Sequence, residues 1–193
     1  DTDADTDADT DADIEEGDCS ASITGSVDGS SVDMTKIAWG ATNSVAFGIG
    51  VSSGNPCDIA EDPTSYTDET MILILSGWTT GVTGDVPIVE GGPPDGEDGG
   101  PPPFDTGAPV DPSDMTAMIE FIPPATGSGE PDIASFTGGT VTLTQNGPTN
   151  QGLIGTLNAT GDSGDTLSGD INACWCQAIV NMLEDLEGEG GPE

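Results

Sequence analysis

The sequence predicts an all-β fold, more specifically an antiparallel β-sandwich with an extended N-terminal strand and a short C-terminal helix. Short runs in which apolar residues alternate with small or polar ones recur along the chain, as strands with one buried and one wet face require. Glycine separates these runs at a spacing typical of sandwich or barrel strands. The aspartate-rich start predicts the extended N-terminal strand, and the apolar tail predicts the C-terminal helix.

The strand pattern fits nine segments. Apolar residues concentrate in short runs such as MILIL (71–75) and AMIEFI (117–122), which indicates a folded body despite the high charge. The expected strands are residues 19–27, 32–39, 44–51, 70–77, 115–122, 132–137, 140–145, 152–159 and 166–176.

Between residues 78 and 114 the strand pattern is lost in a stretch that contains GGPPDGEDGGPPPFDTGAPVDP. Proline removes backbone donors and glycine removes stiffness, so we expect a long loop. The 193 residues, 33% of them hydrophobic, suffice for one domain rather than two. We therefore divide the chain into an acidic extension, residues 1–16, and one domain, residues 17–193.

The tail over 177–187 reads QAIVNMLEDLE and places Ile179, Met182, Leu183 and Leu186 at helical spacing. This spacing predicts a short closing helix. One more edge strand is the alternative.

The charge of the chain excludes two classes of partner. There are 36 acidic residues and a single base, Lys36, which gives a formal net charge of -35. Nucleic acids and anionic membrane surfaces both need a positive footprint that one lysine cannot supply. No apolar stretch approaches the ~20 residues that a membrane-spanning helix needs.

The chain has four cysteines, Cys19, Cys57, Cys174 and Cys176. An even number in a chain rich in Gly, Ser and Thr favours disulfides and an extracellular or cell-surface location. Four buried thiols are one alternative, and a zinc site is a weaker one because the chain has no histidine and no C-x-x-C pair. We prefer two long-range bridges that link the C-terminal pair to Cys19 and Cys57, although the sequence leaves all three connectivities open.

The N-terminal tract DTDADTDADTDAD places aspartate at every odd position. In an extended strand, alternate residues share one face about 6.7 Å apart. Repulsion summed over the tract is on the order of 7 kcal/mol before screening, comparable to the stability of a small domain. An ordered tract therefore needs cations along its anionic edge, which consists of Asp1, Asp3, Asp5, Asp7, Asp9, Asp11 and Asp13.

Calcium (Ca2+) suits this edge because it takes about six to eight oxygen ligands and two carboxylates on one face can share an ion. One strand presents only a few oxygens to any ion, so the others must come from the protein's own body or from a neighbouring copy. A helix-loop-helix calcium loop does not fit, because alanine, threonine or Ile14 stands where its glycine is required.

Weaker metal candidates lie in acidic turns, for each of which a solvated loop is the alternative reading. Glu97 and Asp98 lie in GEDGG, which Asp95 directly precedes, and Asp162 and Asp165 lie in GDSGD. A third group, in CDIAED, consists of Asp58, Glu61 and Asp62.

Enzymatic activity is not expected. Without histidine, and with cysteines expected to be oxidised, paired carboxylates remain as the acid-base chemistry, which would indicate a glycoside hydrolase. Such enzymes usually have aromatic platforms, whereas we expect Trp39, Trp78 and Trp175 in the core.

Three segments resemble uncharacterised surface lipoproteins of soil and predatory bacteria: the Asp/Thr/Ala tract, NPCDIAEDPTSYTDETMILILSG (55–77) and GDTLSGDINACWC (164–176). The resemblance implies a cell-surface location and no particular activity. The doubled cysteine and the tail after it depart from that group.

Two functions follow from the tract. In the first, the protein is a structural subunit of an extracellular filament, and residues 1–16 are a strand donated to the next copy, as in pili built by donor-strand exchange, with calcium on the aspartate edge. In the second, it is a monomeric calcium-binding surface module for a carbohydrate or another partner, and the tract is an acidic spacer. A head-to-tail homo-oligomer distinguishes the first from the second.

Overall fold

The computed structural model places eleven strands and two helices in the residues that it describes, which are 19–42, 45–62, 69–90, 115–124, 133–147 and 152–188. The elements are β1 (Ser20–Val27), β2 (Ser30–Met34), β3 (Lys36–Ala41), β4 (Val45–Val51), α1 (Pro56–Glu61), β5 (Thr70–Ser76), β6 (Gly84–Pro87), β7 (Thr116–Ile122), β8 (Ala134–Phe136), β9 (Gly138–Asn146), β10 (Leu153–Thr160), β11 (Thr166–Trp175) and α2 (Gln177–Gly188).

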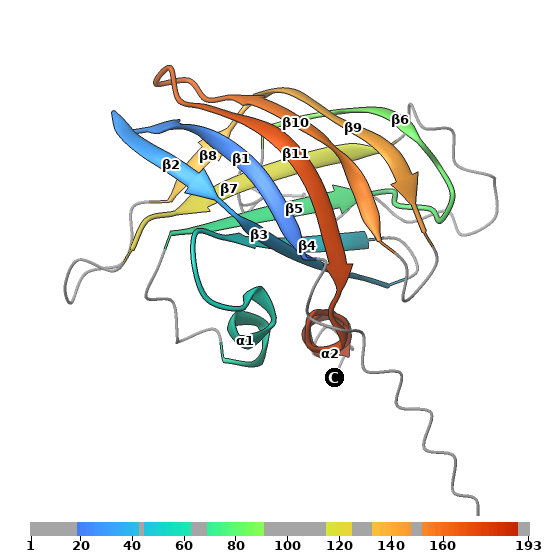
Figure 1. The fold of residues 1–193 in the computed structure, drawn as a ribbon. Coiled ribbons are helices and arrows are strands. Elements are labelled where there is room, and N and C mark those ends of the chain that lie inside the picture. Colours follow the sequence, from blue (N-terminus) through green and yellow to red (C-terminus); the bar gives the residue numbers. More distant parts are fainter. Residues whose placement is uncertain are drawn as a thin grey trace, which may run out of the picture.

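The strands form one mixed sheet that curls into a half-barrel (Figure 1). Its order is β6-β9-β10-β11-β3-β4-β5-β7-β8, and the β1–β2 hairpin branches off β11. All named strand pairs are antiparallel except β11 with β3, which are parallel at two positions. A further parallel bridge between Ile88 and Ala117 links the end of β6 to β7.

The predicted predominance of β-strands is confirmed, with two short helices beside them, whereas the antiparallel sandwich is corrected to this single curled mixed sheet. The reason lies in β11, which pairs with β1 from Thr166 to Asn172 and then with β3 at Cys174 and Trp175. One strand thus joins two antiparallel groups that a sandwich would keep apart. The predicted N-terminal strand lies outside the described residues.

Other expectations about single elements need adjustment. The strand expected at 32–39 is divided at Thr35 into β2 and β3. The N–H of Thr35 donates to Val51 O of β4, so that the chain pairs with β4 from this residue onward. The loop expected at 78–114 is described through residue 90, and this part contains β6. Helix α1 was not predicted from the sequence.

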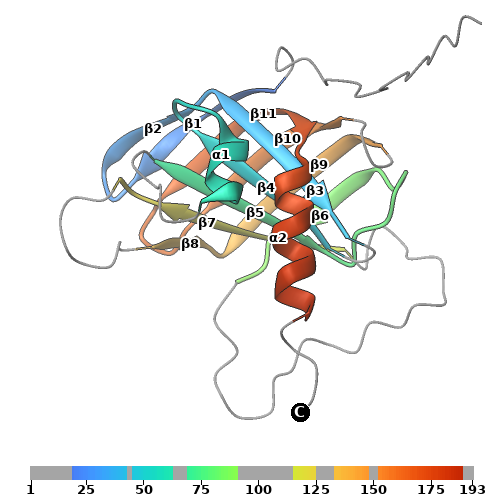
Figure 2. The ribbon, with the colours of Figure 1, turned by 90° about the horizontal axis from the view of Figure 1, so that it is seen from below.

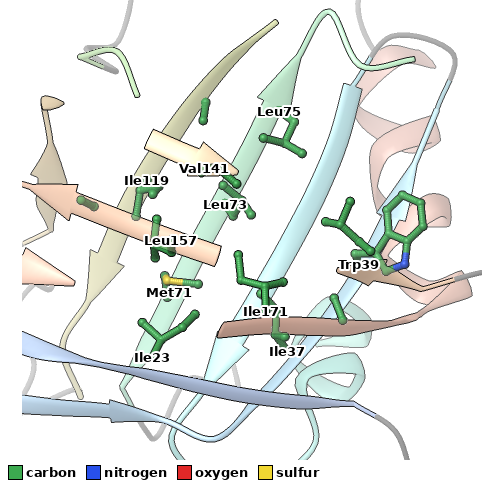
Figure 3. Packing of buried hydrophobic residues seen from close by; sticks show 14 of the residues in the cluster. Ile23, Ile37, Trp39, Met71, Leu73, Leu75, Ile119, Val141, Leu157 and Ile171 are labelled. Carbon is green, nitrogen blue, oxygen red and sulfur yellow. The ribbon is translucent and has the colours of Figure 1, made fainter. Parts of the chain in front are cut away.

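The inner face of the half-barrel holds the main core. Figure 3 shows side chains of β1, β10 and β11, among them Ile23, Leu157 and Ile171, close to Met71 and Leu73 of β5. The three tryptophans lie in this core as predicted, with 0%, 7% and 8% of Trp39, Trp78 and Trp175 exposed.

Both helices cover the outer face of the sheet around β3 and β4, where Figure 2 shows α1 and α2 side by side. The closing helix predicted at 177–187 is confirmed as α2, and its Ile179 is fully buried. Gly40 of β3 permits this close packing, since a Cβ there would lie 3.0 Å from Ile179 Cβ. The start of α1 is fixed by Asn55, whose side chain accepts the N–H of Cys57 at 3.1 Å, and by Pro56 in the first turn.

Candidate functional site

Some of the predicted metal ligands lie outside the described residues, and others are described. The seven aspartates of the N-terminal tract lie outside the described residues, as do Asp95, Glu97 and Asp98. Asp162 and Asp165 are described, and both lie in the turn between β10 and β11. The third acidic group lies on α1 and at its C-terminal end rather than in a glycine-bearing turn.

The β10–β11 turn meets the β1–β2 turn at one end of the half-barrel. Asp28 and Gly29 have φ angles of 50° and 74°, which is the geometry of a two-residue type I′ hairpin turn. The N–H of Asp28 donates to Asp165 Oδ1 at 2.9 Å. Asp165 therefore connects two turns that are 137 residues apart in the chain.

These two turns and the start of β8 border an open surface pocket of about 310 Å³. Three carboxylates line it, Asp28, Asp162 and Asp165, together with Ile133 and other residues at the start of β8. Asp28 and Asp162 are exposed, whereas Asp165 is buried with 7% exposure. This acidic pocket is the place where the structure brings two sequence-predicted ligands together with a third aspartate that the sequence analysis did not select.

The carboxylates of the acidic pocket already have hydrogen-bond donors. Asp165 Oδ2 accepts the hydroxyl of Ser163, so both of its oxygens have partners. Asp162 Oδ1 accepts the hydroxyl of Thr137 at 2.7 Å. Across the described part of the chain, no three acidic or cysteine side chains lie close enough together to hold a metal ion. A cation here would need further oxygens.

The four cysteines form two disulfides, Cys19–Cys174 and Cys57–Cys176, and none of them is free. The bridges span 155 and 119 residues, which confirms the two long-range bonds and selects one of the connectivities that the sequence left open. They indicate an oxidising, non-cytoplasmic location.

The base of the N-terminal extension lies where β11 changes partner. Ser20, the first residue of β1, pairs with Asn172 of β11. Two residues later, Cys174 of β11 pairs with Ala38 of β3. The edge of β11 that pairs with β1 up to Asn172 is thus occupied by β3 at Cys174 and Trp175.

None of the helices in the described ranges is long and apolar enough to span a membrane. No protein-family model, curated protein or solved structure matches this chain significantly.

Proposed function

We propose that the protein is a structural subunit of a self-assembling extracellular filament. Residues 1–16 of one copy are a strand donated to the next copy, and calcium neutralises the aspartate edge of that strand. The observation that carries the proposal is the change of partner on β11, which ends the pairing of β1 at Ser20.

The same observation excludes the simplest intramolecular place for the tract. On one side of β1, β3 occupies β11 from Cys174 onward. On the other side, Thr35 follows the last paired residue of β2, accepts the N–H of Ala21 at 2.9 Å and leads directly into β3. A strand that extends β1 backward would find both neighbouring positions taken, which favours pairing with a different strand.

The length and composition of the tract suit another copy. Thirteen extended residues span roughly 43 Å, enough to cross a small domain. The face opposite the aspartates carries threonine and alanine alone, which can lie against a sheet without a deep groove. Because donation from head to tail does not close on itself, the product is a filament.

The disulfide at the base of the tract also suits a load-bearing subunit. Cys19 directly precedes β1 and is bonded to Cys174, with 4.7 Å between their Cα atoms. A pull on a donated tract therefore acts on a covalent link to β11 before it acts on the hydrogen bonds of β1. The second bridge links α1 to Cys176, directly before α2.

In this proposal calcium supports assembly in two ways: it removes the repulsion between the aspartates, and it binds oxygen ligands from two copies at once. The tract aspartates are the proposed ligands, and Asp95, Glu97, Asp98, Asp162 and Asp165 are secondary ones.

Electron microscopy and sedimentation of the purified chain test the proposal. We expect filaments in millimolar calcium, shorter species after chelation, and a folded monomer when residues 1–13 are deleted. A variant with all seven tract aspartates changed to asparagine is the matched control for charge, and it should assemble without calcium. A wild-type chain that stays monomeric with calcium would refute the proposal.

A monomeric calcium-binding surface module is the second candidate, in which the acidic pocket would supply some of the ligands and further oxygens would complete the site. This candidate predicts calcium binding by a monomer that survives deletion of residues 1–13 and is lost on Asp162→Ala. Isothermal titration of the deletion variant with calcium distinguishes the two.

A further inference from the structure

We infer that the outer edge of β2 is the site that receives the donated strand, namely residues 1–13 of a second copy. This inference rests on the proposed function and names the partner surface that it requires. It follows from the pairing of β2, from the exposure of its outer edge and from the position of Lys36.

The hydrogen-bond pattern of the β1–β2 hairpin identifies which groups of β2 point outward. A two-residue turn makes the flanking pair, Val27 and Ser30, a hydrogen-bonded pair. Bonded and non-bonded pairs then alternate along antiparallel strands. The N–H and C=O groups of Ser31 and Asp33 therefore point away from β1.

The N–H of Thr35, the next residue in the outward series, follows the same pattern, whereas its C=O turns back to β1 and accepts the N–H of Ala21. The Thr35 N–H donates to Val51 O of β4 at 3.0 Å. The outer edge is thus occupied by β4 from Thr35 onward, whereas no named strand pairs with β2 on that side among the described elements. A strand laid beside Ser31 and Asp33 would be in line with β4.

The outer edge of β2 is accessible, and the side chains on the inner face of this strand are already buried in the core. Ser31 and Asp33 are exposed, while Val32 and Met34 are 1% and 0% exposed. An incoming strand therefore needs no large apolar side chain to complete a core. The small threonine and alanine side chains of the tract meet this requirement, and main-chain hydrogen bonds supply the attachment.

Charge points to the same edge. Lys36, the only basic residue of the chain, is exposed and directly follows Thr35 at the end of this edge. An acidic strand that lies along β2 reaches this cation. Asp33 on the same edge repels it, so pairing needs a cation between the two carboxylates, which agrees with calcium-dependent assembly.

Ser31→Pro tests the inference because it removes an outward N–H and leaves the hydrogen bonds of β1 intact. Proline is tolerated on edge strands when its missing donor faces solvent. The matched control is Ser31→Ala, which keeps the N–H. We expect the proline variant to be a folded monomer with calcium, and the alanine variant to form filaments like the wild type.

A mixing experiment then separates donor from acceptor. The Ser31→Pro chain keeps its tract, and the chain without residues 1–13 keeps its β2 edge. Each alone should be monomeric in calcium, and the mixture should sediment as a 1:1 complex without longer species. Filaments of the Ser31→Pro variant would overturn the inference, and if deletion of 1–13 still abolished them, the proposed function would stand with another acceptor edge.

Amide hydrogen exchange gives a readout that does not depend on a substitution in β2. In wild-type filaments we expect slow exchange at Ser31 and Asp33, and in the chain without residues 1–13 fast exchange at both. Equal exchange in the two samples would exclude β2 as the acceptor. Val32, whose N–H faces β1, should be protected in both and is the internal control.

Discussion

The indole N–H of Trp78 donates a 2.8 Å hydrogen bond to the side-chain oxygen of Asn146, which lies 68 residues further along the chain. The side-chain nitrogen of the same asparagine donates to the backbone oxygens of Thr79 and Val82, at 2.9 and 3.1 Å. Asn146 is 3% exposed. One buried amide therefore fixes the turn between β5 and β6 to the end of β9, in a region where the sequence predicts a loop.

Asn146→Leu should destabilise the protein by about 2 kcal/mol or more, because it removes the acceptor of the buried indole N–H of Trp78 and the donor to Val82 O, while Thr79 O keeps the N–H of Val82. Urea unfolding followed by tryptophan fluorescence measures the change. Asn158→Leu, on the exposed face of β10, is the matched control and should stay within about 0.5 kcal/mol of the wild type. Equal losses in both variants would contradict the role of this hydrogen-bond network.

Removal of the Cys19–Cys174 bridge by changing both residues to serine should cost about 2–5 kcal/mol, because the bridge closes a long loop. Thermal unfolding gives the loss, and thiol titration of the denatured wild type should detect no free cysteine. Four free thiols would exclude both bridges. The same double change at Cys57 and Cys176 shows whether the second bridge contributes comparably.

Asp165→Ala should destabilise the protein by about 1–3 kcal/mol, since it leaves the N–H of Asp28 and the hydroxyl of Ser163 without their acceptor near a buried position. Asp162→Ala is the control on the same turn, where the lost partner is an exposed hydroxyl. Its effect should be clearly smaller. If the two variants rank in the opposite order, Asp165 does not connect the two hairpins.

Calcium should raise the melting temperature of the full chain. A site filled at a hundred times its dissociation constant adds about 2.7 kcal/mol, or roughly 5–10 °C for a chain of this size. Differential scanning calorimetry with calcium and with chelator measures the shift, and matched sodium chloride controls for screening. Deleting residues 1–13 should remove most of the shift. An unchanged melting temperature after chelation would rule out calcium along the tract.

Local signals in the sequence locate most elements. Alternation of apolar and polar residues locates β1, β4, β5, β7, β10 and β11, and helical spacing locates α2. Two further signals were present but not used. Asp28-Gly29 is a typical two-residue hairpin turn, and Asn55-Pro56 is a typical helix start.

The sequence by itself determined the strand-rich composition, the closing helix, the core position of the tryptophans and the involvement of all four cysteines, because each depends on short-range periodicity or on residue type. Only the tertiary structure decided that β11 passes from β1 to β3, which cysteines pair, and that Asp28 meets Asp165 across 137 residues. The physical reason is that alternation specifies which face of a strand is buried, but not its neighbour. Which strands become neighbours depends on the packing of the whole core. In this fold, β2 pairs with β1 alone among the named strands, and its outer edge stays exposed.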